Sequence, residues 1–209
     1  MKLSSKILIA ALLFCVTFQG YSQDTSKVTA VKKAFESSYV LEKAANFLGA
    51  IAKIKAVYDE TSYEINLRLG YLYYESIKYR ESEYYYKKAI LLKPNSIEAK
   101  LGIALPLYAL ASWDTLKMQY EAILKLDPNN STANYRMGMI YYYKPDYATA
   151  LTYFQKVNDS YPFDYDNTIM LAWTLLKLKK TTEAKTTFNT VLLIRPNDPS
   201  ALSGLREIK

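Results

Sequence analysis

Histidine is missing from this 209-residue sequence, and cysteine occurs once, at Cys15. Without histidine, the usual general base at neutral pH, histidine-based hydrolase triads and histidine-ligated zinc sites are excluded. The sequence also has no phosphate-binding glycine loop, no metal-ligand spacing and no nucleophile–base pair. We therefore predict a protein that is not an enzyme and that takes no cofactor and no metal ion.

Glycine and proline are scarce, with 6 and 7 residues, which is too few for a disordered or all-β chain. Half of the residues are apolar, so a sizeable core can form. Tyrosine is abundant, with 21 residues against 7 phenylalanines. Its apolar ring and polar hydroxyl suit surfaces that are half buried or that contact a partner.

The formal net charge is +7, and Lys2 and Lys6 of the N-terminal segment contribute two of these charges. The remaining positive charge is spread evenly along the chain. A nucleic-acid binder is expected to gather its basic residues on one face. We therefore predict that the protein does not bind nucleic acid and that its basic residues keep the surface soluble.

Residues 1–22 are typical of a secretory signal peptide. Lys2 and Lys6 precede an apolar stretch over residues 7–18, and Gly20 and Ser22 provide small residues for cleavage before Gln23. We expect export to the periplasm or cell envelope of a bacterium, or secretion, with no stable membrane span after cleavage. The alternative is an uncleaved membrane anchor. Cleavage would remove Cys15, so the mature chain is predicted to be stabilised by packing alone, without a disulfide.

Four prolines recur at intervals of 34 residues: Pro94, Pro128, Pro162 and Pro196. They define four units without insertions, in which we number the positions 1 to 34: residues 63–96, 97–130, 131–164 and 165–198. Position 8 is always small: Gly70, Ala104, Gly138 and Ala172. Position 24 is always aromatic: Tyr86, Tyr120, Phe154 and Phe188. Position 20 is small in three units and leucine in the second: Ser82, Leu116, Ala150 and Ala184.

This pattern predicts two helices in each unit. Positions 4, 7, 8 and 11 share one face of a first helix, and positions 20, 24 and 27 share one face of a second. Small residues at positions 8 and 20 let the helices approach closely, and the aromatic ring at position 24 fills the gap. Turn residues such as Lys144-Pro145-Asp146 separate the helices. Pro106 lies inside a first helix, and we expect it to bend or locally break that helix.

Four consecutive units with this pattern resemble the tetratricopeptide repeat (TPR) family. The resemblance implies an all-α, right-handed solenoid of helix-turn-helix repeats. Residues 31–62 are similar to a degenerate fifth repeat with Phe47 at position 17, and the polar residues 23–30 before it are predicted to be a linker. Residues 199–209 are predicted to form a C-terminal capping helix, which stacked repeats need.

The resemblance also implies that positions 2, 5, 9, 12 and 13 face a concave groove. At positions 5, 9, 12 and 13 this groove is apolar and aromatic with sparse charge, from Glu75 and Lys177 at position 13. Its predicted partner-binding residues are Leu67, Tyr71, Tyr74, Leu101, Leu105, Tyr108, Tyr135, Met139, Tyr142, Tyr143, Ile169, Trp173 and Leu176. Lysine and asparagine, which family members that clamp a carboxylate carry at positions 5 and 9, are absent there.

We predict a non-catalytic scaffold that binds a peptide or protein segment in this groove, with Trp173 and Tyr142 as anchors. Three alternatives stay open. The protein is a structural protein that self-associates, it binds carbohydrate or an envelope polymer, or the groove residues pack on neighbouring helices and bind no partner. A further candidate is the junction 161–166, Tyr-Pro-Phe-Asp-Tyr-Asp, which is aromatic and acidic. It is either a surface contact loop or an ordinary repeat junction.

Overall fold

The computed structural model describes residues 25–208, so the predicted signal segment lies outside the described residues. Within residues 25–208 the chain forms helices, turns and loops without a strand, which confirms the all-α prediction. None of the helices in this range combines the length and apolar character needed to cross a membrane. The chain divides into two compact units, Met1–Pro94 and Asn95–Lys209.

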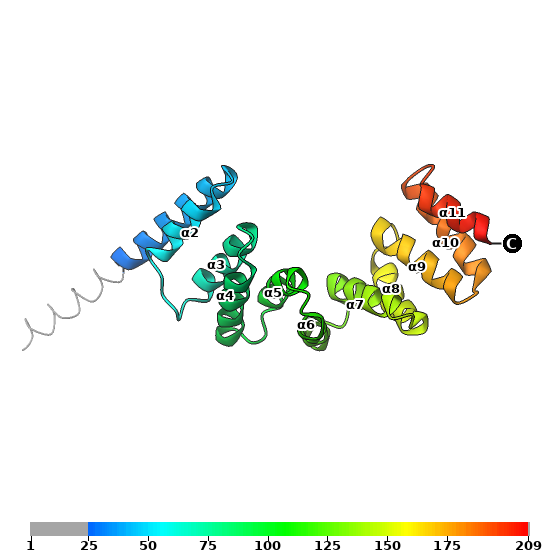
Figure 1. Ribbon diagram of the computed structural model, residues 1–209, viewed down its shortest axis with the longest axis horizontal. Helices are drawn as coiled ribbons and strands as arrows, with labels where there is room; N and C mark the ends of the chain where they lie inside the picture. Colours follow the sequence, from blue (N-terminus) through cyan, green and yellow to red (C-terminus); the bar gives the residue numbers. More distant parts are fainter. Residues whose placement is uncertain (1–24, 209) are drawn as a thin grey trace, which may run out of the picture. The chain divides into compact units, whose positions relative to one another are not determined.

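The first unit contains residues 25–43, which are helical, followed by three helices that Figure 1 labels. These are α2 (Phe47–Lys55), α3 (Tyr63–Glu75) and α4 (Tyr79–Leu92). Buried aliphatic side chains of α2 and α3, among them Ile54, Ile65 and Leu69, form the core with Tyr85 of α4. Helix α2 begins at Phe47, the residue placed at position 17 from the sequence.

The predicted linker is wrong over residues 25–30, because these residues are helical and continue directly into residues 31–43. The polar side chains there are compatible with the helix. The Thr29 hydroxyl donates to the carbonyl oxygen of Thr25 at 2.8 Å, within the helix. Lys27 forms an ion pair with Asp59 at 2.8 Å, which ties this end of the helix to the segment before α3.

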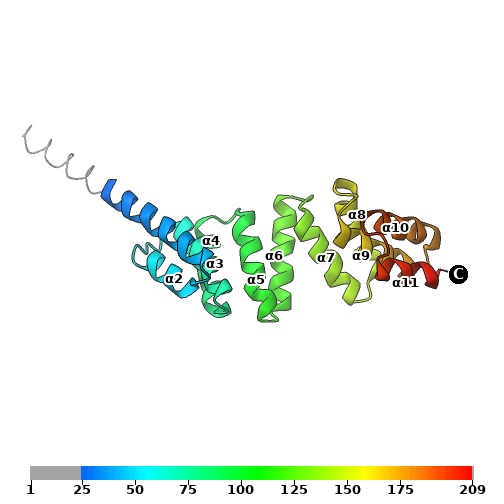
Figure 2. The same cartoon turned by 90° about the horizontal axis from the view of Figure 1, so that it is seen from above.

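The second unit contains seven described helices in consecutive order (Figures 1 and 2). They are α5 (Ile97–Ala109), α6 (Trp113–Leu126), α7 (Ser131–Tyr143), α8 (Tyr147–Ser160), α9 (Tyr165–Lys177), α10 (Thr181–Ile194) and α11 (Pro199–Glu207). The core of this unit is centred on the buried rings of Phe154 and Phe188. Helix α11 packs against α9 and α10, as expected of a cap on the last repeat.

The 34-residue period is visible in the helix boundaries. In each of the four repeats the first helix covers positions 1–13 and the second covers positions 17–30. The residue at position 34 caps the helix that follows, because its side chain accepts a hydrogen bond from the backbone N–H three residues later. The residues that do this are Ser96, Asn130, Asp164 and Asp198, and Ser62, directly before the first unit, caps α3 in the same way. The Lys144-Pro145-Asp146 turn lies between α7 and α8 as predicted.

The residues at positions 8, 20 and 24 are buried in all four repeats, as the sequence pattern predicts. The fit between positions 8 and 24 is tight. A Cβ atom added to Gly70 would lie 2.8 Å from the ring of Tyr86, and one added to Gly138 would lie 2.6 Å from the ring of Phe154. Since real Cβ contacts are longer than this, the small residue is what admits the aromatic ring.

Pro106 does not break its helix, so of the two expected effects, a bend or a local break, the break is wrong. Helix α5 continues from Ile97 to Ala109 with Pro106 buried at the start of its last turn. Pro106 lacks the N–H that would bond Gly102, but its own carbonyl oxygen still accepts the N–H of Leu110 at 2.9 Å. Only the last residues of the helix follow the proline, so little of the hydrogen-bond ladder is affected.

Candidate partner-binding site

A cavity of about 360 Å³ lies in the second unit, where the ends of α5 and α7 meet the start of α6. Its volume is in the range of pockets that hold small molecules or single side chains of a partner. The lining residues are Tyr108 of α5; Trp113, Asp114, Leu116, Lys117 and Tyr120 of α6; Arg136, Met139, Ile140 and Tyr143 of α7; and Lys144. We call this cavity the α5–α7 pocket.

Three aromatic rings of the α5–α7 pocket are unusually exposed. Tyr108 is 60% exposed, Trp113 is 55% exposed and Tyr143 is 72% exposed. The rings of Tyr108 and Trp113 meet edge to face, with centroids 5.3 Å apart. Tyr143 packs edge to face on Tyr142 at 5.6 Å. Large rings that leave this much apolar surface in water, grouped around one cavity, are typical of a contact surface for a partner.

The charged residues of the pocket are mostly cationic, with Lys117, Arg136 and Lys144 against Asp114. Lys117 pairs with Glu121 at 3.4 Å, and interactions with Tyr141 and then Glu121 raise the pKa of its ammonium group. Among the described residues, Arg136 and Lys144 have no ion pair, and the Arg136 guanidinium lies 5.7 Å from the Tyr135 ring. The pocket therefore combines an apolar interior with cations that can pair with a carboxylate of a partner.

The pocket forms where the second repeat departs from the pattern. Leu116 lies at position 20, where the other repeats have serine or alanine, and it is buried. Helices α5 and α6 pack against each other less extensively than the helix pairs of the other repeats. Leucine is bulkier than the serine or alanine of the other repeats, and its side chain forms part of the pocket wall.

Only a few of the predicted groove residues meet in this pocket. Tyr108, Met139 and Tyr143 line it. Tyr108, Tyr143 and Leu105 are exposed, and Ile169 is buried. The others are half-buried: Leu67, Tyr71, Tyr74, Leu101, Tyr135, Met139, Tyr142, Trp173 and Leu176.

Tyr71 is held by contacts within the first unit. Its hydroxyl donates to the Glu42 carboxylate at 2.9 Å, and Arg68 pairs with the same carboxylate at 2.6 Å. Burial and then the Glu42 carboxylate raise the pKa of Tyr71 to about 12. Arg68 also donates to the hydroxyl of Ser38 at 3.1 and 3.0 Å. Tyr71 thus joins residues 25–43 to α3, which is a packing role inside the unit.

Trp173, one of the two predicted anchors, is also engaged within its unit. Its indole N–H donates to the Ser200 hydroxyl at 2.9 Å, and its ring packs edge to face on Phe188 at 5.2 Å. Tyr142, the other anchor, packs edge to face on Tyr147 at 5.4 Å, and burial raises the pKa of its hydroxyl. Both residues are half-buried core contacts in the second unit.

Trp113, Lys117 and Arg136 are not among the predicted groove residues, because they lie at positions 17, 21 and 6 of their repeats. The sequence carries a signal for one of them. Position 17 is Tyr79, Trp113, Tyr147 and Thr181, so the largest residue of the set belongs to the repeat whose position 20 is also atypical. The two cations carry no comparable signal, since lysine and arginine are common on any helix surface.

A second cavity, of about 410 Å³, lies between α8, α9 and α10 and is rich in threonine. The hydroxyls of Thr186, Thr187 and Thr190 donate to backbone carbonyls of their own helix at 3.2, 2.9 and 3.3 Å. These hydroxyl hydrogens are therefore already used. No aromatic ring lines this cavity, and it has one charged residue, Glu183, so it is a weaker candidate for a binding site. Within residues 25–208, no cluster of acidic residues is arranged to hold a metal ion.

Comparisons with known proteins identify the repeats. Tetratricopeptide repeat models match residues 145–208 and residues 63–96. No curated protein sequence matches this chain.

Solved structures with the same fold include TPR proteins at low sequence identity. A TPR protein from Parabacteroides merdae ATCC 43184 has a TM-score of 0.74 at 18% identity, over 86% of this chain and 72% of that one. MamA has a TM-score of 0.69 at 18% identity, over 79% of this chain and 91% of that one. YrrB, a TPR protein whose structure is described as having an unusual peptide-binding site, has a TM-score of 0.69 at 16% identity, over 90% and 97%.

At these identities the solved structures establish the fold alone. The family models match the sequence itself as tetratricopeptide repeats, and the repeat geometry agrees with that match. The fold supports, in general terms, a scaffold for protein–protein interaction. The chain is a member of the tetratricopeptide repeat family.

Proposed function

We propose that this protein is a non-catalytic scaffold that binds a segment of a partner protein in the α5–α7 pocket. The observation that carries the proposal is the set of three exposed rings, Tyr108, Trp113 and Tyr143, around one cavity. Aromatic side chains at the centre of an interface supply much of its binding energy, and they are enriched among hot-spot residues. The pocket thus replaces Trp173 and Tyr142 as the expected anchor site.

The size and composition of the pocket favour a peptide segment as the ligand. A cavity of about 360 Å³ accommodates one or two side chains, and the cations Arg136 and Lys144, which have no ion pair among the described residues, can pair with a carboxylate beside them. YrrB has the same fold, and its description as a TPR protein with an unusual peptide-binding site supports a peptide here by analogy. The proposal concerns binding alone, in keeping with the lack of a recognisable catalytic motif in the sequence.

The place of action that we propose is the bacterial cell envelope or the space outside the cell. The support is the N-terminal sequence, with Lys2 and Lys6 before the apolar stretch 7–18 and small residues at Gly20 and Ser22. N-terminal sequencing of the protein recovered from its host tests this proposal. A mature chain that starts at Gln23 supports it, and a chain that keeps residues 1–22 in the cytoplasm overturns it.

The binding proposal is tested by a crosslinking pull-down from the native host. The pocket variant is Trp113→Thr with Tyr143→Ala, which uses residues that other repeats have at positions 17 and 13. The matched control is Leu193→Lys, because Leu193 is 73% exposed in α10 and lies outside the pocket. We expect the wild type and the control to capture the same partners and the pocket variant to lose them. Capture of the same partners by all three chains would overturn the proposal.

A further inference from the structure

The junction between α8 and α9 carries two exposed aromatic rings that the repeat does not require. Phe163 is 65% exposed and occupies position 33, where the other repeats have Asn95, Asn129 and Asn197. Tyr161 is 55% exposed and occupies position 31, where the other repeats have Lys93, Asp127 and Arg195. The other three junctions are therefore built without an aromatic ring at either position.

The turn itself is formed by other atoms. Pro162 follows the end of α8 as the proline does in every repeat. The backbone N–H of Asp164 donates to the carbonyl oxygen of Tyr161 at 3.1 Å, and the Asp164 side chain caps α9 by accepting the N–H of Asn167 at 2.8 Å. None of these bonds uses the rings of Tyr161 or Phe163. Exposure of two rings without a structural role indicates a contact with another molecule.

The chemistry of this junction matches that of the α5–α7 pocket. The junction, residues 161–166, offers aromatic rings beside the carboxylates of Asp164 and Asp166. The pocket offers the rings of Tyr108, Trp113 and Tyr143 beside Lys117, Arg136 and Lys144. Edge-to-face packing of rings and pairing of carboxylates with cations are both favourable, so the two surfaces are complementary.

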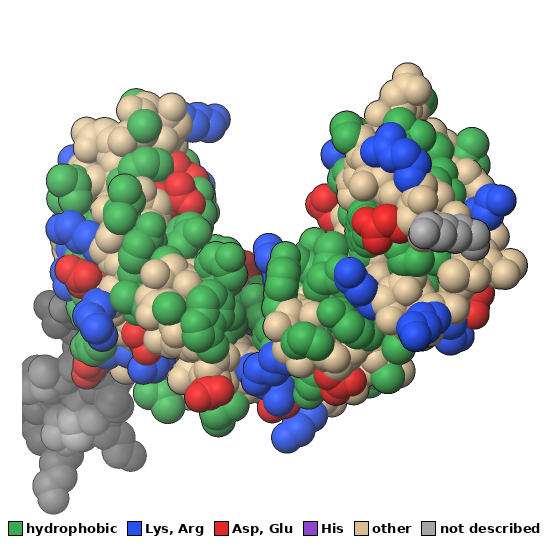
Figure 3. Space-filling view, turned by 45° about the vertical axis from the view of Figure 1, so that its right-hand side comes forward, with side chains coloured by type: hydrophobic (Ala, Val, Ile, Leu, Met, Phe, Trp, Pro, Cys, Tyr) green, Lys and Arg blue, Asp and Glu red, His purple; other side chains and the backbone are tan. Residues whose placement is uncertain are grey.

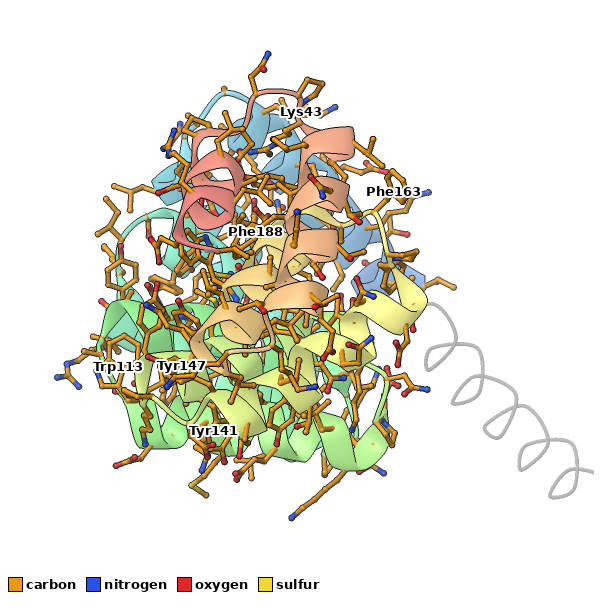
Figure 4. All side chains as sticks on the ribbon, turned by 90° about the vertical axis from the view of Figure 1, so that its right-hand side faces the viewer. Lys43, Trp113, Tyr141, Tyr147, Phe163 and Phe188 are labelled. Carbon is orange, nitrogen blue, oxygen red and sulfur yellow. The ribbon has the colours of Figure 1, made fainter. Side chains whose placement is uncertain are left out.

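The two surfaces cannot meet within one copy of the chain. Both belong to the second unit, and Figure 4 shows Phe163 and Trp113 on opposite sides of its helices. The junction lies where second helices end and first helices begin, whereas the pocket lies where first helices end and second helices begin. These are the two ends of helices of 13 and 14 residues, which are about 20 Å long. Contact between them requires a second copy.

We propose that residues 161–166 of one copy dock into the α5–α7 pocket of another copy. This inference rests on the proposed function, because it names a second copy of the chain as the partner of the same pocket. The contact is heterologous, since the junction of one copy meets the pocket of the next. An open assembly always has a free junction on the copy at one end and a free pocket on the copy at the other end, so association continues beyond the dimer unless a ring closes.

Sedimentation velocity of the full chain over a range of concentrations tests this proposal, with N-terminal processing left to the expression host. The junction variant is Tyr161→Lys with Phe163→Asn, which uses the residues of the first repeat at the same positions. The pocket variant is Trp113→Thr with Tyr143→Ala, and the control is Leu193→Lys. Circular dichroism checks that all chains keep the helix content of the wild type.

We expect the wild type and the control to associate as concentration rises, and each variant alone to show at least a tenfold weaker association. A mixture of the two variants gives the sharpest result. The pocket variant still has a junction and the junction variant still has a pocket, so the mixture is expected to form 1:1 dimers that grow no further. A symmetric contact would not give this result.

The proposal is overturned if the wild type stays monomeric up to about 1 mM, a concentration at which even a contact with a Kd of about 1 mM would associate measurably. It is also overturned if either variant associates like the wild type, or if the mixture forms no dimer. A monomeric wild type that still captures other proteins through the pocket would overturn self-docking and leave the proposed function intact. If the pocket variant still associates and still captures the same proteins as the wild type, both the self-docking proposal and the proposed function are overturned.

Discussion

Gly138 lies in α7 opposite the ring of Phe154, which is fully buried in α8. Alanine normally stabilises a helix interior relative to glycine by about 0.5 to 1 kcal/mol. At this position the added Cβ would lie 2.6 Å from the ring, so the ring or the helix has to move. We expect Gly138→Ala to lower the free energy of unfolding by about 1 to 3 kcal/mol in urea denaturation. A variant as stable as the wild type would show that the two helices are not closely packed at this point.

Ile77 lies in the turn between α3 and α4 with a φ of 64°. The same turn of other repeats has Ala45, Ala111 and Lys179 at φ of 54°, 53° and 60°. This left-handed conformation costs a residue with a Cβ about 1 to 2 kcal/mol, and more for a β-branched side chain. The sequence does not predict it, because glycine, the usual residue for such a turn, is missing at all of these positions.

Replacing Ile77 by glycine tests whether the positive φ of this residue strains the backbone of the turn. Ile77 is 72% exposed, so little buried apolar surface is lost with its side chain. We expect Ile77→Gly to raise the free energy of unfolding by about 1 kcal/mol, and Ile77→Ala, which keeps the Cβ, to give a smaller gain. Urea denaturation of both variants measures the difference. A gain from alanine as large as that from glycine would contradict the assignment of strain to the backbone.

Asp198 couples the stability of the C-terminal helix to pH. Its carboxylate accepts the N–H of Ala201 at 2.9 Å and the hydroxyl of Tyr165 at 2.8 Å. Burial acts to raise the pKa of Asp198, but these hydrogen bonds outweigh burial and hold the pKa below its ordinary value. Because the pKa is lowered in the folded state, the stabilisation is complete above the unfolded-state pKa of about 4 and is lost as the pH falls through the lower folded-state value.

The variant Asp198→Asn separates the cap from its charge. Asn130 caps α7 at the same position of the repeat, so asparagine is accepted there, but it does not titrate. We expect the variant to lose less unfolding free energy than the wild type between about pH 5 and pH 2, as measured by urea denaturation at several pH values. Equal losses in the two chains would show that Asp198 makes no net contribution to the acid response.

At the scale of the elements, α11 covers the end of the last repeat. Its Gly204 lies so close to the ring of Phe188 that an added Cβ would overlap the ring, and its Ser200 hydroxyl accepts a hydrogen bond from the Trp173 indole N–H. We expect a chain that ends at Asn197 to lose about 2 to 3 kcal/mol of unfolding free energy, since it exposes apolar surface around Phe188. Urea denaturation measures the loss. An unchanged stability would mean that α11 is not a cap.

The presence of two helices in each unit, and the residues that they bury, could be predicted because the pattern repeats. The proline, the small residue at position 8 and the aromatic residue at position 24 recur in four units, so one reading explains all of them. Residues 25–30 could not be predicted in this way. Their helix is stabilised by contacts such as the Lys27–Asp59 ion pair, which joins residues 32 apart and leaves no local sequence signal.

The candidate site was predictable only in part, because contacts between residues far apart in the sequence leave no local signal. The repeat pattern assigns a side chain to a face of its helix, so Tyr108, Met139 and Tyr143 were identified. It does not reveal which of these rings a neighbouring element covers. Trp173 is covered by α11 and Tyr71 is bonded to Glu42, and both contacts come from helices outside the four regular repeats.

At the scale of the whole molecule, the surface supports binding of specific partners more than binding by bulk charge. Figure 3 shows hydrophobic side chains reaching the surface with Lys and Arg side chains scattered among them. Scattered charge of this kind leaves recognition to local features of the surface. The α5–α7 pocket is the described feature that joins exposed rings to unpaired cations.

The central claim is that a partner binds in the α5–α7 pocket and not in the rest of the predicted groove. Site-specific photo-crosslinking in the native host tests it most directly. A photoreactive phenylalanine analogue replaces one residue at a time: Tyr108 or Tyr143 in the pocket, and Tyr71 or Trp173 in the predicted groove outside it. We predict adducts with a partner protein, or with a second copy of the chain, from residues 108 and 143, and none from residues 71 and 173. Adducts from residues 71 and 173 without any from 108 and 143 would contradict the account.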